Sequence, residues 1–306
     1  MRVRGVLVGA VLLTFVLAAG CGAAAGHPSG KLDVVATESF LADIAQNVAG
    51  DRFTVQTLIP RGTDPHSFEP TPRDVASVAG ADLVIINGGG LEGPLLDTLK
   101  NAGGRAKIVD ASAGLKTRTP KPGEPSLAAG QTDPHFWLDP VLVETYAANI
   151  RDAFIAADPS GAAAYTANAA AYDAKLTALD AWIRVQVAQI PRQGRKLVTD
   201  HASHGYFADR YGLRVVGTVI PGVGTSETPT ARQLAGLTAA IRSAGVHAIF
   251  VELGDNPELA RQIAAETGIK VVTGLLDHTL SPPGGPAPTY IDMMKYDTRQ
   301  IVEALK

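Results

Sequence analysis

The feature that most constrains the fold of this chain is a regular alternation of short β-rich runs with amphipathic helical patterns from Lys31 onward. The runs are rich in Val, Ile and Leu, and the helical patterns between them can serve as crossover connections. Such alternation predicts an α/β fold in which parallel sheets carry helices on both faces. The runs expected to form strands are 32–37, 53–58, 83–87, 107–110, 196–199, 214–219, 248–252 and 270–273.

A long helical pattern interrupts this alternation after the fourth strand. It starts at Asp158-Pro159-Ser160, contains neither Pro nor Gly beyond Gly161, and ends near Ile190. Apolar residues recur in it at steps of three and four, which predicts ~30 residues of helix, or ~45 Å. We therefore expect an N-terminal lobe (32–157) and a C-terminal lobe (191–306), each with a central, mainly parallel sheet, joined by one rigid helix (158–190).

Other segments of the chain predict shorter helices and one loop. Helices are expected at 40–49, 230–243 and 257–267, and two further helices should start at Thr71 and Thr289. Thr71-Pro72-Arg73-Asp74 is a typical helix start, because a Thr cap is followed by Pro and then by an acid at the third position. Residues 116–131 are rich in Pro, Gly, Lys and Thr, which predicts an exposed and mobile loop.

The beginning of the chain predicts export. Arg2 and Arg4 precede an uncharged apolar stretch that is too short for a comfortable membrane span, which is typical of a secretory signal over 1–20. Small residues lead up to Cys21, the only cysteine, as in a bacterial lipobox in which that cysteine is lipidated. The alternative is an ordinary signal peptide with an incidental cysteine. In the lipidated form, residues 21–31 would be a flexible tether between the membrane and the folded part of the chain.

Charge and cysteine content narrow the class of protein. The full chain has a formal net charge of −3, and removal of residues 1–20, with two arginines and no acids, leaves −5. Nucleic-acid binding favours a basic surface, so nucleic acid is not an expected partner. One cysteine cannot form an internal disulfide framework.

The tripeptide Asp-Pro-His occurs twice, with His66 in DPHSFEPTPRD and His135 in DPHFWLDP. Proline stiffens the backbone beside each histidine, so each imidazole is presented from a fixed turn. Neutral imidazole is the commonest metal ligand in proteins, and both copies belong to the predicted N-terminal lobe. This repetition predicts half of a metal site.

The C-terminal lobe offers further candidates at the carboxyl ends of predicted strands, where ligand sites of open α/β folds gather. His201 directly follows the strand at 196–199, and His204 would lie near it on a helix, either as a chelating partner or packed with Tyr206. Asp277 follows the strand at 270–273, and His278 could replace it as the ligand. Three imidazoles and one carboxylate suit Zn²⁺, whereas Mn²⁺ prefers more oxygen donors.

These motifs together resemble the zinc- and manganese-binding solute-binding proteins of bacterial metal ABC importers, from Leu32 to Lys306. The resemblance implies metal ligands at His66 and His135, at His201 in TDHASHGYFADRYGL, and at Asp277 in the segment LDH. Two departures add an imidazole near the implied site: His204 stands where the family usually has Phe, and His278 where it usually has Pro. The loop at 116–131 contains no histidine, whereas many zinc-binding members have a His-rich loop there.

The resemblance implies a non-enzymatic, monomeric lipoprotein that captures Zn²⁺, with Mn²⁺ as the alternative, between two lobes and delivers it to an ABC permease. One rival is a zinc hydrolase with Glu252 as general base, although the chain has no H-E-x-x-H helix and Asp277 would close the fourth position. Another rival is a siderophore or corrinoid receptor of the same fold, which would need an aromatic cleft without convergent histidines.

Overall fold

The computed structural model describes residues 31–306 except 102, 123, 126 and 128–130. By its internal contacts the chain divides into Met1–Lys31 and Leu32–Lys306, and the description below concerns the second unit. The predicted signal peptide (1–20), Cys21 and the predicted tether up to residue 30 lie outside the described residues. No helix within the described ranges combines the length and apolar character that a membrane span needs.

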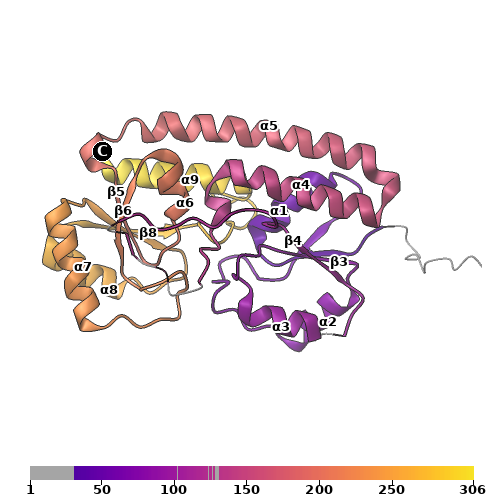
Figure 1. Ribbon diagram of the computed structural model, residues 1–306, viewed down its shortest axis with the longest axis horizontal. Coiled ribbons are helices and arrows are strands. Elements are labelled where there is room, and N and C mark those ends of the chain that lie inside the picture. The colour runs from indigo at the N-terminus through magenta and orange to yellow at the C-terminus, as the bar shows by residue number, and fades with distance from the viewer. Residues whose placement is uncertain (1–30, 102, 123, 126, 128–130) are drawn as a thin grey trace, which may run out of the picture. The chain divides into compact units, whose positions relative to one another are not determined.

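Two four-stranded parallel sheets form the centre of Leu32–Lys306, as Figure 1 shows. The first has the order β2-β1-β3-β4 and the second the order β6-β5-β7-β8. The α/β two-lobe fold is thereby confirmed, and each predicted strand is present. The strands are β1 (Val34–Ala36), β2 (Val55–Thr57), β3 (Leu83–Ile86), β4 (Lys107–Asp110), β5 (Lys196–Thr199), β6 (Arg214–Thr218), β7 (Ala248–Glu252) and β8 (Lys270–Leu275).

Helices cover both faces of each sheet, as the continuously apolar strands require. In β1, Val34 and Ala36 face one core, and Val35 faces another on the opposite side of the sheet. The helices of the first lobe are α1 (Ser39–Ala49), α2 (Pro72–Gly80), α3 (Gly93–Asn101) and α4 (Pro140–Ala157). Those of the second lobe are α6 (Gly205–Tyr211), α7 (Ala231–Ala244), α8 (Glu258–Thr267) and α9 (Tyr290–Leu305).

The long helix is α5 (Ala162–Val187), which contacts α1 and α4 at one end and α6 and α9 at the other (Figure 1). It is shorter than the predicted 158–190, because Pro159–Gly161 forms a short 3₁₀ helix before it. Its buried stripe includes Tyr165, Leu176 and Ile183, each fully buried. One apolar cluster runs from the first sheet through this stripe into the second lobe. The two lobes therefore share a core.

Helix α4 was not among the predicted helices. Its start carries the usual signals, because the Asp139 carboxylate accepts a hydrogen bond from the Val141 backbone N–H at 3.0 Å and Pro140 occupies the first position. The predicted start at Thr71 is confirmed: Thr71 and Asp74 form a reciprocal capping box at the beginning of α2.

Phe40 provides a test of the shared core. Its ring is fully buried and stacks on Trp137 with centroids 4.5 Å apart. We expect Phe40→Ala to lower the free energy of unfolding by about 3–5 kcal/mol in denaturant titrations, because it leaves a cavity beneath Trp137. Val185, which is 62 % exposed, is the matched control. Val185→Ala should change the free energy of unfolding by less than ~0.5 kcal/mol. A Phe40→Ala loss as small as that of the control would contradict this packing account.

Candidate metal centre

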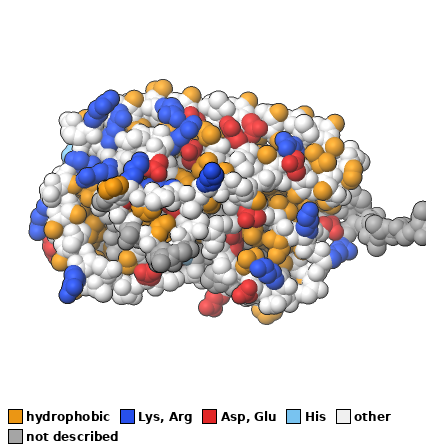
Figure 2. Space-filling model, viewed as in Figure 1, with side chains coloured by type: hydrophobic (Ala, Val, Ile, Leu, Met, Phe, Trp, Pro, Cys, Tyr) orange, Lys and Arg blue, Asp and Glu red, His pale blue; other side chains and the backbone are white. Residues whose placement is uncertain are grey.

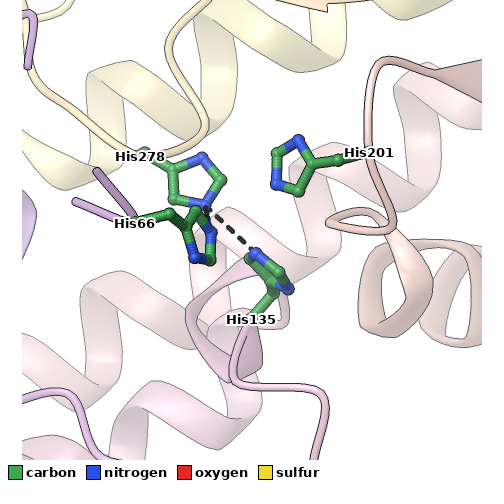
Figure 3. A group of neighbouring side chains, drawn as sticks. All are labelled: His66, His135, His201 and His278. Carbon is green, nitrogen blue, oxygen red and sulfur yellow. Dashed lines mark hydrogen bonds between the residues drawn. The ribbon is translucent and has the colours of Figure 1, made fainter. Parts of the chain in front are cut away.

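Four imidazoles converge between the two lobes, as Figure 3 shows. His66 lies in the loop after β2, His135 just before the short 3₁₀ helix Phe136–Leu138, His201 in the turn after β5, and His278 in the turn after β8. One ring nitrogen of each lies within 4.8 Å of those of the other three. The site is thus assembled from segments that are distant in sequence, with two histidines from each lobe.

His278 lies closest to the two histidines of the first lobe. Its Nε2 is 3.1 Å from Nε2 of His135 and 3.3 Å from Nε2 of His66. His135 and His201 are completely buried, and His278 is nearly so. His66 is only partly buried, and it borders a cavity of about 360 Å³ that Gly90, Leu91 and other loop residues also line. The cluster is therefore closed to solvent on most sides and is approached past His66.

Carboxylates orient three of the four rings. Nδ1 of His135 lies 2.8 Å from Asp133, Nδ1 of His201 lies 3.1 Å from Asp200, and Nδ1 of His278 lies 2.5 Å from Glu252. Each carboxylate thereby engages Nδ1 of its ring, which leaves Nε2 as the nitrogen available to a cation. Nε2 of His201 is buried and has no hydrogen-bond partner among the described residues. This is the arrangement expected of rings prepared to coordinate a cation.

The two Asp-Pro-His segments share a local structure that their sequence explains. In each, the aspartate carboxylate accepts a hydrogen bond from the backbone N–H of the histidine two residues on, at 2.8 Å for Asp64 and 3.1 Å for Asp133. This Asx turn, with proline at its centre, fixes the path of the backbone into each histidine. Asp64 also accepts a hydrogen bond from Thr225 Oγ1 of the second lobe at 2.6 Å.

Asp277 lies beside the imidazole cluster. Its carboxylate is buried, with one oxygen 3.6 Å from Nδ1 of His278 and the other 3.6 Å from Nδ1 of His204. It groups with Glu252 and His278, while His278 also belongs to the group of four imidazoles. Of the two adjacent candidates for the fourth position, the structure thus brings His278 to the other histidines, with Asp277 next to it.

His204 does not share a helix with His201. The segment after β5 forms a turn, and α6 begins only at Gly205. Nδ1 of His204 lies 2.8 Å from Ser203 Oγ, and its ring packs edge-on against Phe207 with centroids 6.0 Å apart. The predicted alternative, in which His204 packs against the apolar side of this helix, agrees with this position.

His201 also belongs to a second group of titratable side chains, whose other members are Asp200, Glu252 and Asp255. Asp200 accepts hydrogen bonds from the backbone N–H groups of His201 at 2.8 Å and of Glu252 at 2.7 Å, so it joins the ends of β5 and β7. From the sequence, Glu252 was predicted only as a candidate general base. Its position at the carboxyl end of β7 was the available signal for its role beside His278.

The surroundings move the histidine pKa values in opposite directions. Burial, reinforced by His278 and His201, lowers the pKa of His66 to about 2, and the same effects lower the pKa of His135 well below its usual range. Burial also acts to lower the pKa of His201, but Asp200 and Glu252 outweigh it and raise that pKa to about 9. The rings of His66 and His135 are thus held neutral near neutral pH, whereas His201 is protonated on both ring nitrogens and carries a positive charge.

Comparisons with known proteins agree with this fold. Residues 34–304 match the protein family described as "Zinc-uptake complex component A periplasmic". The manganese-binding lipoprotein MntA of Halalkalibacterium halodurans is 33% identical over 298 residues, which cover 96% of each chain. The iron-binding protein YfeA of Yersinia pestis is 32% identical over 276 residues, covering 89% of this chain and 86% of its own.

Solved structures give the same result. The periplasmic zinc-binding protein TroA of Treponema pallidum superposes with a TM-score of 0.82 at 27% identity, over 90% of this chain and 99% of its own. A manganese-bound periplasmic metal-binding protein of Candidatus Liberibacter asiaticus superposes with a TM-score of 0.77 at 29% identity, over 89% of this chain and 99% of its own. The fold and the cluster define a metal receptor of the two-lobed type. The chain belongs to the zinc-uptake component A family of substrate-binding receptors of metal ABC importers.

The charge state of His201 predicts that metal binding releases a proton. Because a coordinating imidazole must give up the proton on its ligating nitrogen, an ion that binds to His201 at about pH 7 should displace about one proton from it. The apparent affinity should therefore rise with pH up to about 9 and then level off. Calorimetric titration in buffers of different ionisation enthalpy measures this release. An affinity that stays constant from neutral pH to about 9, with no proton released, would contradict it.

Proposed function

We propose that this protein captures Zn²⁺ at the interlobe histidine cluster and delivers it to an ABC permease, with Mn²⁺ as the alternative ion. The observation that carries this proposal is the convergence of four imidazoles, two from each lobe, within 4.8 Å. Gathering four imidazoles in a buried space, with Nε2 of His201 left without a hydrogen-bond partner among the described residues, is costly without a ligand, so a cation is the natural occupant.

The donor set favours zinc over manganese. Four nitrogen donors suit tetrahedral Zn²⁺, with Zn–N distances near ~2.0–2.1 Å, whereas Mn²⁺ prefers carboxylate and other oxygen donors. The relatives are named for manganese, iron and zinc, so the family alone does not choose the ion. The choice for this chain rests on its own ligands.

We assign His66, His135 and His201 as three ligands and His278 as the fourth. Support for His278 comes from its Nε2, which faces His135 and His66, and from Glu252, which holds its Nδ1. Asp277 remains the alternative fourth ligand, because both its oxygens are buried and make no hydrogen bond among the described residues. With Asp277 in place of His278, an oxygen donor would replace a nitrogen donor in the ligand set, which would favour Mn²⁺.

A receptor agrees better with these contacts than a hydrolase does. A catalytic zinc site keeps one position open for water and places a free base beside it. Here Glu252, the candidate base, is buried and engaged with His278, and the fourth position has two candidate protein ligands. Assays of the wild type and Asp277→Ala for peptidase and lactamase turnover would favour the hydrolase if either protein showed it. The siderophore and corrinoid alternatives are disfavoured because imidazoles occupy the centre of the site.

We further propose that the protein acts outside the cytoplasmic membrane as a monomer anchored through a lipid on Cys21. Relatives named as lipoproteins support the anchor. Basic and acidic side chains both occur across the face shown in Figure 2, in keeping with a net charge of −3 for the full chain. A metal receptor needs no basic surface for nucleic acid, so this charge distribution agrees with the proposal.

Calorimetric titration of the wild type and two histidine variants tests the function. The wild type should bind one Zn²⁺ per chain and bind Mn²⁺ more weakly. His201→Ala should weaken zinc binding by more than about 100-fold. Removal of a residue that only hydrogen-bonds to a ligand typically lowers metal affinity about 10–100-fold, and loss of a ligand itself should lower it further. His204→Ala, a buried neighbour assigned no ligand role, is the matched control and should change affinity by less than about tenfold. The proposed function would be contradicted if the wild-type protein bound neither ion with a defined stoichiometry.

The fourth ligand can be tested with adjacent variants. His278→Ala should reduce zinc affinity more than Asp277→Ala does, and it should narrow the difference between Zn²⁺ and Mn²⁺, since it leaves Asp277 as the nearest donor. Titrations of both variants with each ion measure this. If Asp277→Ala abolished zinc binding and His278→Ala left it intact, Asp277 would be the fourth ligand instead.

A further inference from the structure

We propose that Arg118 is a positioning residue that fastens the segment carrying His135 to α6 of the other lobe and thereby slows release of the bound ion. This inference rests on the proposed metal-receptor function and adds a residue to it that lies outside the imidazole cluster. Arg118 belongs to the loop at 116–131, which the sequence predicts to be exposed. Its side chain is instead only 9 % exposed.

The guanidinium of Arg118 is surrounded by carboxylates from both lobes. Its Nε donates to Asp209 of α6 at 2.9 Å, and one terminal nitrogen donates to Glu124 at 2.5 Å. The other terminal nitrogen lies 3.9 Å from Asp133. A planar guanidinium can serve several carboxylates at once in fixed directions, which a lysine cannot. Arg118 therefore joins α6 to the carboxylate that orients His135.

Backbone and hydroxyl contacts reinforce the same junction. The backbone N–H of Arg118 donates to the hydroxyl of Tyr206 at 3.1 Å, and that hydroxyl donates to the backbone carbonyl of Asp133 at 3.0 Å. The Tyr206 ring also packs against Phe136, with centroids 4.9 Å apart. Tyr206 belongs to α6, so Asp133 and Phe136, on both sides of His135, are held against this helix.

The guanidinium fits closely over the first turn of α6. A Cβ added to Gly205 would come within 2.6 Å of an Arg118 nitrogen, so a larger residue there would displace the guanidinium. His204, immediately before this turn, and Ala202 border the same small space as Arg118. The junction thus lies between the segments that carry His135 and His201, one from each lobe.

Release of the ion requires the two pairs of histidines to separate or to lose their alignment. Because Arg118 connects one pair to the other lobe through charged contacts with Asp133 and Asp209, breaking these contacts adds to the barrier for release. Affinity changes of this kind act mostly on dissociation rates, while association rates change little. Removing Arg118 should therefore shorten the residence time of the ion without preventing its capture.

Stopped-flow release of Zn²⁺ to a chelator tests the proposal, with calorimetry on the same proteins. Arg118→Met, which keeps much of the apolar length, should release zinc roughly tenfold faster or more, with an association rate within about threefold of the wild type. Asp209→Asn should give a smaller change in the same direction. In the double variant the two effects should not add, because both remove the same contact. Arg118→Lys should fall between wild type and Arg118→Met.

Arg52→Met is the matched control. Arg52 also pairs with an aspartate, Asp158 at 2.6 Å, but it lies in the turn after α1, and neither residue belongs to a segment that carries a histidine of the cluster. The Arg52→Met variant should release zinc at the same rate as the wild type. If Arg118→Met and Asp209→Asn lowered the melting temperature of the metal-free protein without changing zinc release, Arg118 would be merely structural and the inference would fail. If the wild type bound no zinc, the failure would instead lie with the proposed function.

Discussion

The shared apolar core is the constraint on which the rest of this structure depends. The buried stripe of α5 packs against α1 and α4 of the first lobe and against α6 and α9 of the second. This packing fixes how the carboxyl ends of the two parallel sheets face one another. Since ligand loops follow those ends, the distance between the two pairs of histidines is set by hydrophobic burial far from the histidines themselves.

Electrostatics then determines what the space between the sheets can hold. Burial alone would keep every imidazole neutral, as it does for His66 and His135. Asp200 and Glu252 oppose burial at His201, so the metal-free cluster carries positive charge among buried carboxylates. A divalent cation can replace that proton and satisfy the unpartnered Nε2 of His201 at the same time. The site is prepared for an ion by the groups behind the rings as much as by the rings.

Sequence accounts for much of this arrangement. The alternation of strands and helices predicted the two sheets, and strand ends placed His66, His201 and the Asp277-His278 pair on the same side. The sequence pattern could not decide whether Asp277 or His278 faces the other histidines. The direction of a side chain in a turn depends on tertiary contacts, such as that of His278 with Glu252. The burial of Arg118 was also missed, since a polar, proline-rich loop gives no sign that its arginine packs among the carboxylates of Glu124 and Asp133 in the first lobe and Asp209 in the second.

The X-ray absorption spectrum of the protein loaded with one equivalent of Zn²⁺ reports directly on the ligands of the bound ion. Coordination by the four histidines should give a nearest shell of nitrogen at about 2.0–2.1 Å, with the outer-shell scattering of about four imidazoles, one of them from His278. The same spectrum from His278→Ala should show about three imidazoles. A zinc shell dominated by oxygen in the wild type, with fewer than three imidazoles, would contradict the claim that the four histidines form the metal centre.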